Sequence, residues 1–280
     1  MDAQKLYDKL EIDFITRRGL SDDWKEMGND KYLSPNFKKR SIGVVYDFTT
    51  EIKKVYTAVF PEVEVLKKVL SKKEKDVLLF LHHPMVWDIT KKSIFTSISE
   101  KDLKIMKDRR ISVYCLHVPL DNFGKYSTTN TLCKELGIKV EKQFVPYFGG
   151  LCGVIGTIDV DNIKDIKKRF DKVLGHKTKL YNYGTERLKE HKVAVVAGGG
   201  NDLETLKEIP KNCNLLITGI TAKNAYSKPS HDYLEEKKIN LLGGTHYSTE
   251  KFACIAMVEY FKKQGLPCEF IPGKPIMEDI

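Results

Sequence analysis

Short apolar runs alternate with amphipathic stretches along most of the chain. Runs of mainly apolar residues predict buried strands over 77–81, 111–116, 151–158, 192–197, 214–218 and 239–242. Apolar residues at helical spacing predict helices over 4–18, 62–73, 128–136, 161–174, 230–238 and 248–263, and a short helix after Asp202. Residues 53–60 favour a further strand, and the polar residues 19–41 favour a long loop. Strands that alternate with helices indicate an α/β fold with largely parallel pairing.

Histidines follow three of these predicted strands. His82 and His83 come directly after residues 77–81, and His117 follows 111–116. His246 lies a few residues beyond 239–242. Because open α/β sheets place their ligands at the carboxyl ends of their strands, chemistry is expected there.

Two carboxylates accompany the histidines, Asp121 after His117 and Glu250 after His246. Imidazole nitrogens and carboxylate oxygens are donors that Zn, Mn and Fe(II) accept. Asp121 and Glu250 are the natural bridging groups, because a carboxylate has two oxygens whereas a neutral imidazole offers one lone pair. The alternative is that each histidine is an independent polar residue at a strand end. Four of seven histidines in one context favour a shared metal site.

Other motifs leave two interpretations open. The turn Gly198-Gly199-Gly200-Asn201 could cradle a phosphate with its amides or be a plain tight turn, and Thr218 could contact substrate or cap a turn. Cys115 shares a strand face with His117, which would allow a Cys–His nucleophile. The six cysteines form no Cys-x-x-Cys pair, so the sequence suggests neither disulfides nor a thiolate zinc site.

Composition narrows the class of protein. With 41% hydrophobic and 30% charged residues, the 280-residue chain resembles an ordinary soluble protein. No apolar run reaches the roughly 18 residues of a membrane span and the N-terminus does not read as a signal peptide, so we expect a cytoplasmic protein. A formal charge of +9 favours anionic ligands such as nucleotides or nucleic acid, although lysine-rich helix faces such as 164–172 explain it equally well.

The motifs in order resemble a known family. His-His-Pro (82–84), His-x-x-x-Asp (117–121) and Gly-Thr-His-Tyr-Ser-Thr-Glu (244–250) are similar to those of the Ngg-interacting-factor-three-like family, the dinuclear metal-centre proteins labelled type 2 homologues of GTP cyclohydrolase 1. Val193–Gly200 and Leu215–Gly219 look like two further family motifs. The resemblance begins at about residue 42. Before it, Lys39-Arg40-Ser41 replace the family's Trp-Asp-Asn, and Phe60 stands where an Asp is common.

The resemblance implies a fold and a site. It implies two similar-sized α/β halves with largely parallel or mixed sheets, here 1–150 and 151–280, and a metal site in the cleft between them. It assigns two divalent ions, most simply Zn, Mn or Fe, to the five residues His82, His83, Asp121, His246 and Glu250. His117 is expected to act as the catalytic acid or base, with metal ligation as the alternative. A homohexamer is also implied.

Two functions follow from this assignment. The first is a metal-dependent hydrolase that acts on a nucleotide or a related phosphorylated anion, either by opening a guanine ring or by cleaving a phosphoester. The alternative is a metal-binding interaction or regulatory protein without small-molecule turnover. Nucleic-acid binding by the basic surface is a third, weaker possibility that requires a steep salt dependence.

Overall fold

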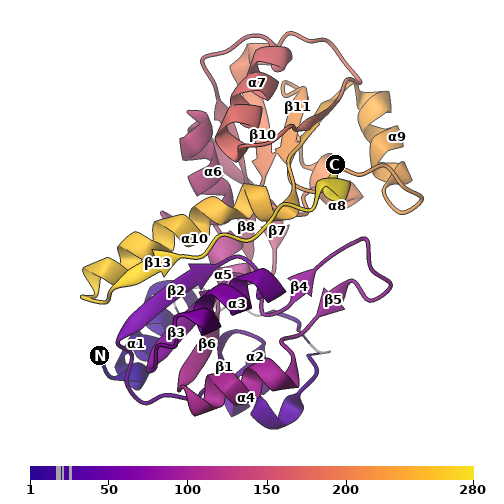
Figure 1. Ribbon diagram of the computed structural model, residues 1–280. Helices are drawn as coiled ribbons and strands as arrows, with labels where there is room; N and C mark the ends of the chain where they lie inside the picture. Colours follow the sequence, from indigo (N-terminus) through magenta and orange to yellow (C-terminus); the bar gives the residue numbers. More distant parts are fainter. Residues whose placement is uncertain (17–19, 21, 25–26) are drawn as a thin grey trace. The chain divides into compact units, whose positions relative to one another are not determined.

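The computed structural model describes residues 1–16, 20, 22–24 and 27–280, and these form two compact units. Unit 1 consists of Met1–Leu120, Phe148–Gly150 and Cys254–Gly273, and unit 2 consists of Asp121–Tyr147, Leu151–Ala253 and Lys274–Ile280. Each unit has a sheet and helices, so the predicted α/β class is confirmed (Figure 1). The sequence prediction divided the chain once, after residue 150. In the structure both units are discontinuous: unit 2 begins at Asp121, Phe148–Gly150 belongs to unit 1, and the last part of the chain contributes to both.

Unit 1 has a five-stranded sheet in the order β1-β6-β3-β2-β13. Its strands are β1 (Gly43–Tyr46), β2 (Lys54–Ala58), β3 (Val77–Leu81), β6 (Ile111–Cys115) and β13 (Cys268–Phe270). Strands β6, β3, β2 and β13 are parallel, whereas β1 pairs with β6 in the antiparallel sense. Every residue of β3 and β6 is buried, as expected for central parallel strands with both faces covered.

The helices of unit 1 have clear local causes. They are α1 (Ala3–Leu10), the π-helix η1 (Glu11–Ile15), η3 (Asp30–Tyr32), α2 (Pro35–Arg40), α3 (Val63–Ser71) and α4 (Glu100–Asp108). The N-cap side chains of Ser34 and Ser99 accept hydrogen bonds from the backbone of the first turns of α2 and α4. Val65, Val69, Leu103 and Met106 from α3 and α4 pack into the same core as the sheet. A two-stranded hairpin, β4 (Val86–Trp87) and β5 (Phe95–Thr96), follows the two histidines.

Unit 2 has a six-stranded mixed sheet in the order β7-β8-β10-β11-β12-β9. Its strands are β7 (Lys139–Tyr147), β8 (Gly150–Thr157), β9 (Lys179–Tyr181), β10 (Lys192–Val196), β11 (Leu215–Thr218) and β12 (Asn240–Gly243). The central strands β10, β11 and β12 are parallel, and β8 and β9 pair with them in the antiparallel sense.

The helices of unit 2 are α6 (Thr128–Leu136), α7 (Ile163–Leu174), α8 (Leu203–Lys207) and α9 (Lys228–Lys237), with the short 3₁₀ turns η4 (Lys189–His191) and η5 (Met277–Asp279). Helix α7 directs Ile163, Ile166 and Phe170 into the core, as the helical spacing predicts. The short helix α5 (Val118–Asp121) ends on the first residue of unit 2. Helix α10 (His246–Lys263) begins in unit 2 and continues into unit 1 at Cys254.

Most predicted elements exist. The prediction of a long loop over residues 19–41 is wrong. The 3₁₀ turn η3 and helix α2 lie in this segment. The parts of the predictions that fall on 17–19, 21 and 25–26 lie outside the described residues. Strands β1, β7, β9 and β13, the β4–β5 hairpin and helices α4 and α5 were not predicted either. Among the described residues, the structure has no helix with the length and apolar character needed to cross a membrane.

Candidate functional site

His82 and His83 begin where strand β3 ends. The backbone amides of the two histidines donate to the carbonyl oxygens of Ala58 (3.1 Å) and Val59 (2.9 Å), which extends the pairing with β2. Both residues are fully buried. Neighbouring residues on a continuing strand would point to opposite faces, but these rings lie with their centroids 4.4 Å apart. The strand has therefore ended, and both imidazoles face one region of unit 1.

His117 joins them from the neighbouring strand. The parallel register pairs Leu81 with Cys115, which brings the ends of β3 and β6 to the same edge of the sheet. The His117 ring centroid lies 4.6 Å from that of His83 and 5.3 Å from that of His82. One ligand nitrogen from each of the three lies within 4.8 Å of the others, a spacing that allows them to hold a metal ion. We call His82, His83 and His117 the histidine cluster.

Asp22 orients His117. The Oδ2 atom of Asp22 lies 2.9 Å from Nδ1 of His117 and accepts a second hydrogen bond from Nε1 of Trp24 at 2.9 Å. Burial by itself would raise the pKa of Asp22, but the charge of His117 and the hydrogen bonds from His117, the Asp23 amide and Trp24 lower the pKa overall. An ionised carboxylate can only accept, so the Nδ1 atom of His117 carries the proton in this contact.

Aromatic rings surround the histidine cluster. Trp24 contacts His117 edge-on at a centroid distance of 5.1 Å, and Phe60 stacks on His83 at 4.5 Å. The ring of Trp87, which follows the His-His-Pro motif, lies 6.4 Å from that of His83. Phe60 therefore places an apolar face where relatives were expected to carry an acid. These rings lower the local polarity, which strengthens electrostatic interactions at the cluster.

Cys115 supports the backbone of this cluster. Its thiol donates to the carbonyl oxygen of His82 at 3.1 Å, and the Leu116 carbonyl oxygen lies 2.9 Å from Nδ1 of His82. With the sulfur directed at a backbone oxygen, the geometry gives no support to Cys115 as a nucleophile paired with His117.

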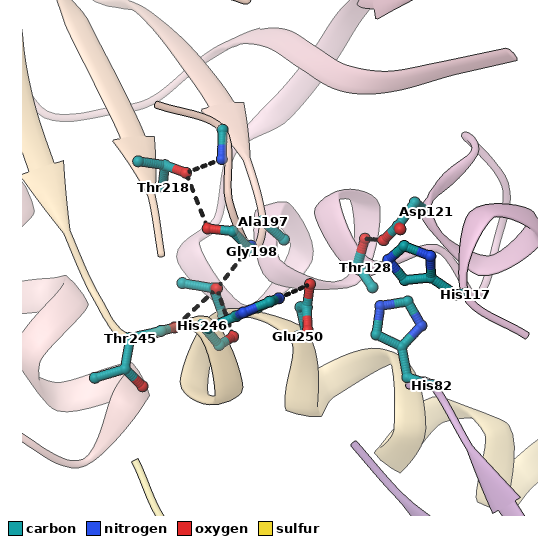
Figure 2. Close-up of polar contacts among 12 residues, drawn as sticks. His82, His117, Asp121, Thr128, Ala197, Gly198, Thr218, Thr245, His246 and Glu250 are labelled. Carbon is teal, nitrogen blue, oxygen red and sulfur yellow. Dashed lines mark hydrogen bonds and ion pairs between the residues drawn. The ribbon is translucent and has the colours of Figure 1, made fainter. Parts of the chain in front are cut away.

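His246 and Glu250 lie on one face of α10 in unit 2. They are one helical turn apart, and Nε2 of His246 is 3.1 Å from Oε1 of Glu250 (Figure 2). Both side chains are almost fully buried, with 5% and 3% exposed. The predicted i, i+4 arrangement is therefore present in this unit.

Asp121 lies near Glu250. An oxygen of Asp121 and an oxygen of Glu250 lie within 4.8 Å of each other. The hydroxyl of Thr128, at the start of α6, donates to Oδ1 of Asp121 at 2.9 Å (Figure 2). Asp121 and Glu250 are both buried. We call Asp121, His246 and Glu250 the carboxylate cluster.

The glycine turn after β10 makes room for Glu250. Gly198 has a φ of +75°, and a Cβ atom there would lie 2.2 Å from Oε1 of Glu250. Only glycine fits both the backbone conformation and this close approach. The Gly198 amide donates to Oγ1 of Thr249 and the Gly200 amide to Oγ1 of Thr218, each at 3.0 Å. With these two amides engaged, the geometry favours the tight-turn interpretation over a phosphate cradle, and Thr218 ties the turn together.

Asp22 and Trp24 are the site residues that sequence reasoning missed. The segment was read as a loop because of its polarity. The signal available in the sequence is a tryptophan in this polar segment, and in the structure Trp24 is only 8% exposed. Ser41, one of the residues that depart from the family pattern, accepts a hydrogen bond from the Trp24 amide at 3.0 Å and so helps to place it.

Comparisons with known proteins place most of the chain in one family. A sequence model of the family described as Duf34/NIF3 (NGG1p interacting factor 3) matches residues 36–275. A protein of Borreliella burgdorferi named GTP cyclohydrolase 1 type 2 homolog is 27% identical over 244 residues, covering 86% of this chain and 90% of the relative. A protein of the same name from Methanocaldococcus jannaschii is 28% identical over 223 residues, 79% and 84% of the two chains.

Solved structures share the fold. The protein ybgI, described as of unknown function, matches with a TM-score of 0.75 at 18% identity over 99% of this chain and 100% of its own. Reduced HcgD from Methanocaldococcus jannaschii matches with a TM-score of 0.68 at 21% identity over 98% of each chain. At these identities the likeness establishes the fold alone.

Proposed function

Because the chain belongs to the Duf34/NIF3 family, we propose that it is a hydrolase that uses two divalent metal ions and acts on a nucleotide or related phosphorylated anion. The observation that carries the proposal is the pair of buried carboxylates, Asp121 and Glu250, whose oxygens lie within 4.8 Å of each other. The name shared by the relatives, GTP cyclohydrolase 1 type 2 homolog, supports a nucleotide as the substrate class.

The donor chemistry fits a metal. Two buried carboxylates this close repel each other unless a proton or a cation lies with them. Apolar residues would pack as well as the three buried imidazoles, so packing does not explain why histidines stand here. Metal binding would explain them, because neutral imidazole is the commonest protein ligand of transition metals. A mixed set of nitrogen and oxygen donors suits Zn, Mn or Fe(II).

We assign metal binding to His82, His83, Asp121, His246 and Glu250, with Asp121 and Glu250 as the bridging groups. Each of these donors stands in one of the three motifs that resemble those of the family. Asp121 ends the short helix α5, which starts directly after His117. Glu250 precedes Cys254, the first residue of α10 assigned to unit 1, by one helical turn.

When bound, two divalent cations would lower the pKa of water toward 7 and neutralise charge that develops on the reacting oxygens. In this proposal His117 carries a proton during the reaction. Asp22 holds the Nδ1 proton, so Nε2 is the nitrogen that would accept a proton and return it to a leaving group. Trp24 and Phe60 would limit the access of bulk water to this imidazole.

The test is metal analysis of the purified chain followed by a turnover screen. Inductively coupled plasma mass spectrometry should give two ions per chain. The metal-loaded protein is then offered guanine nucleotides and phosphodiesters, with release of formate and of phosphate or alcohol as readouts. His82→Ala should lose metal and turnover, whereas the same change at His191, an exposed histidine paired with Asp161, should change neither.

Two outcomes separate the candidate functions. Two bound ions without turnover of any offered substrate would favour the metal-binding interaction protein. Absence of bound metal would contradict the metal-dependent hydrolase, and full turnover in His82→Ala would contradict the assignment of His82 as a required ligand. The homohexamer and the cytoplasmic location remain predictions, and light scattering of the purified chain would test the first.

A further inference from the structure

We propose that Asp279, the next-to-last residue, is a positioning residue that fixes the metal ligand His246; this rests on the proposed function of that histidine. Oδ2 of Asp279 accepts a hydrogen bond from the backbone amide of His246 at 2.9 Å. Asp279 is 3% exposed although it lies at the chain end. The carboxylate thus holds the first residue of helix α10 from outside the helix.

The backbone of Asp279 is itself anchored in unit 2. Its carbonyl oxygen accepts hydrogen bonds from the amides of Thr221 (2.6 Å) and Ala222 (2.8 Å), which follow strand β11. The 3₁₀ turn η5 ends at Asp279 and shapes this end of the chain. The side chain therefore approaches His246 from a fixed backbone, and little side-chain entropy opposes the contact.

The start of α10 needs this contact because its first amides have no partner within the helix. The first four amides of any helix lack intrahelical acceptors. Thr245 caps one of them, since its Oγ1 accepts from the amide of Ser248 at 3.1 Å. Asp279 supplies a second acceptor, and its negative charge is favourable at the positive end of the helix dipole.

Loss of the Asp279 contact should affect the two proposed metal ligands of helix α10 differently. His246 is in the first turn, where loss of a cap frays the backbone, whereas Glu250 lies one turn further in and keeps its intrahelical bonds. Loss of the Asp279 carboxylate should therefore release His246 and leave Glu250 in place. The Nε2 to Oε1 contact between them, 3.1 Å, depends on the first turn being formed.

The test compares three substitutions. Asp279→Ala removes the acceptor, Asp279→Asn keeps one, and Glu278→Ala removes the exposed neighbouring carboxylate in the same 3₁₀ turn as a matched control. Metal affinity is measured by chelator competition with Zn²⁺ and Co²⁺, and the Co²⁺ absorption spectrum reports the ligand set. Hydrogen exchange of residues 244–253 in the metal-free chain reports the first turn of α10.

Asp279→Ala should weaken metal binding about 10–100-fold, as is usual when the partner that orients a ligand is removed. It should also alter the Co²⁺ spectrum and speed exchange of the first turn. Glu278→Ala should behave like the unaltered chain. Asp279→Asn should bind metal within about fivefold of it, because Asn is a comparable cap and only the favourable charge at the helix dipole is lost. If Asp279→Ala does not fold, Asp279→Leu keeps the side-chain volume without the acceptor and takes its place.

Affinity and exchange in Asp279→Ala equal to those of Glu278→Ala would overturn the proposal. The proposed function fails differently, through absence of metal binding in the unaltered chain. In that event the exchange measurement still decides whether Asp279 holds the start of α10, so the two failures are distinguishable.

Discussion

The Nδ1 atom of His117 lies 2.9 Å from Oδ2 of Asp22, a residue 95 positions earlier in the chain. The carboxylate is nearly buried, with 4% of its side chain exposed. It fixes both the ring orientation of His117 and the nitrogen that carries its proton. Asp22, which lies in none of the described helices and strands, thus orients a histidine at the end of a central strand.

Replacing Asp22 by Asn should lower turnover about 10–100-fold, because a partner that orients the imidazole is weakened. The amide has no charge to stabilise a protonated ring and its NH₂ group can turn toward Nδ1. Metal content should stay unchanged. Steady-state rates of the metal-loaded protein check this, and Asp23→Asn, on the exposed neighbouring residue, is the control. Equal rates in both variants would show that the contact is only structural.

His117→Asn should retain both metals while turnover falls about 10²–10⁴-fold, the usual value of general acid–base catalysis. The pH–rate profile should lose one of its limbs, because Asn does not titrate near neutrality. His191→Asn is the matched control, since His191 is a half-exposed histidine far along the sequence in unit 2. Stoichiometric loss of one metal in His117→Asn would instead make His117 a ligand.

Substitution of either bridging carboxylate should affect metal content and apo stability in opposite directions. Asp121→Asn and Glu250→Gln should each reduce bound metal below two ions per chain. Each should also raise the melting temperature of the metal-free chain, because two nearby buried carboxylates no longer repel. Glu259→Gln, an exposed position on the same helix α10, should change neither quantity. Two ions retained in both variants would contradict the bridging assignment.

Gly198→Ala should weaken metal binding by at least about tenfold, because the added Cβ would lie 2.2 Å from Oε1 of Glu250 and displace that carboxylate. Gly175→Ala is a control for backbone strain alone. Gly175 also has a positive φ, +82°, but no atom lies within 4 Å of an added Cβ. Both variants should lose about 1–2 kcal/mol of stability from the left-handed conformation. Only Gly198→Ala should lose metal, as measured by chelator competition.

The carboxyl group of Asp76, in unit 1, should make the free energy of unfolding depend on pH. Hydrogen bonds from Arg110, with Nε at 2.5 Å, and from Lys53 at 2.9 Å hold the pKa of this carboxyl well below its usual range. In the unfolded chain the pKa is about 3.9, so the stabilisation is complete above that value and is lost as the pH falls below it.

Asp76→Asn should therefore cost about 1 kcal/mol of unfolding free energy at pH 7, since both partners are half-exposed, and less at pH 3. Asn also accepts the left-handed backbone that Asp76 adopts at a φ of +61°. Urea unfolding at the two pH values measures the difference. A loss that is as large at pH 3 as at pH 7 would show that the ion pairs do not carry the effect.

Elements with complete local signals were predicted to the residue. Strand β3 occupies Val77–Leu81 as predicted, because the apolar run is bounded by Asp76 and the two histidines. Helix α6 occupies Thr128–Leu136 as predicted, because the Ser127 side chain caps its start and Gly137 ends it in a left-handed conformation. In both cases the residues that define the boundary are sequence neighbours.

Elements that depend on distant partners were missed. Strand β13 is only Cys268–Phe270, and it exists because it pairs with β2, more than 200 positions earlier. The long-loop prediction for residues 19–41 failed for a related reason. Helix α2 carries the local signals of a Ser34 cap and Pro35 in its first turn, but the polarity of the surrounding segment outweighed them in the prediction.

The sequence by itself determined the donor chemistry: histidines and carboxylates follow strands, and strand ends can be read from local hydrophobicity. Only the tertiary structure decided which groups meet. It placed Asp22 on His117, Gly198 against Glu250 and Asp279 on the amide of His246. These contacts join residues 33 to 95 positions apart. Such pairs form because packing fixes their backbones, and no periodicity of neighbouring residues encodes that packing.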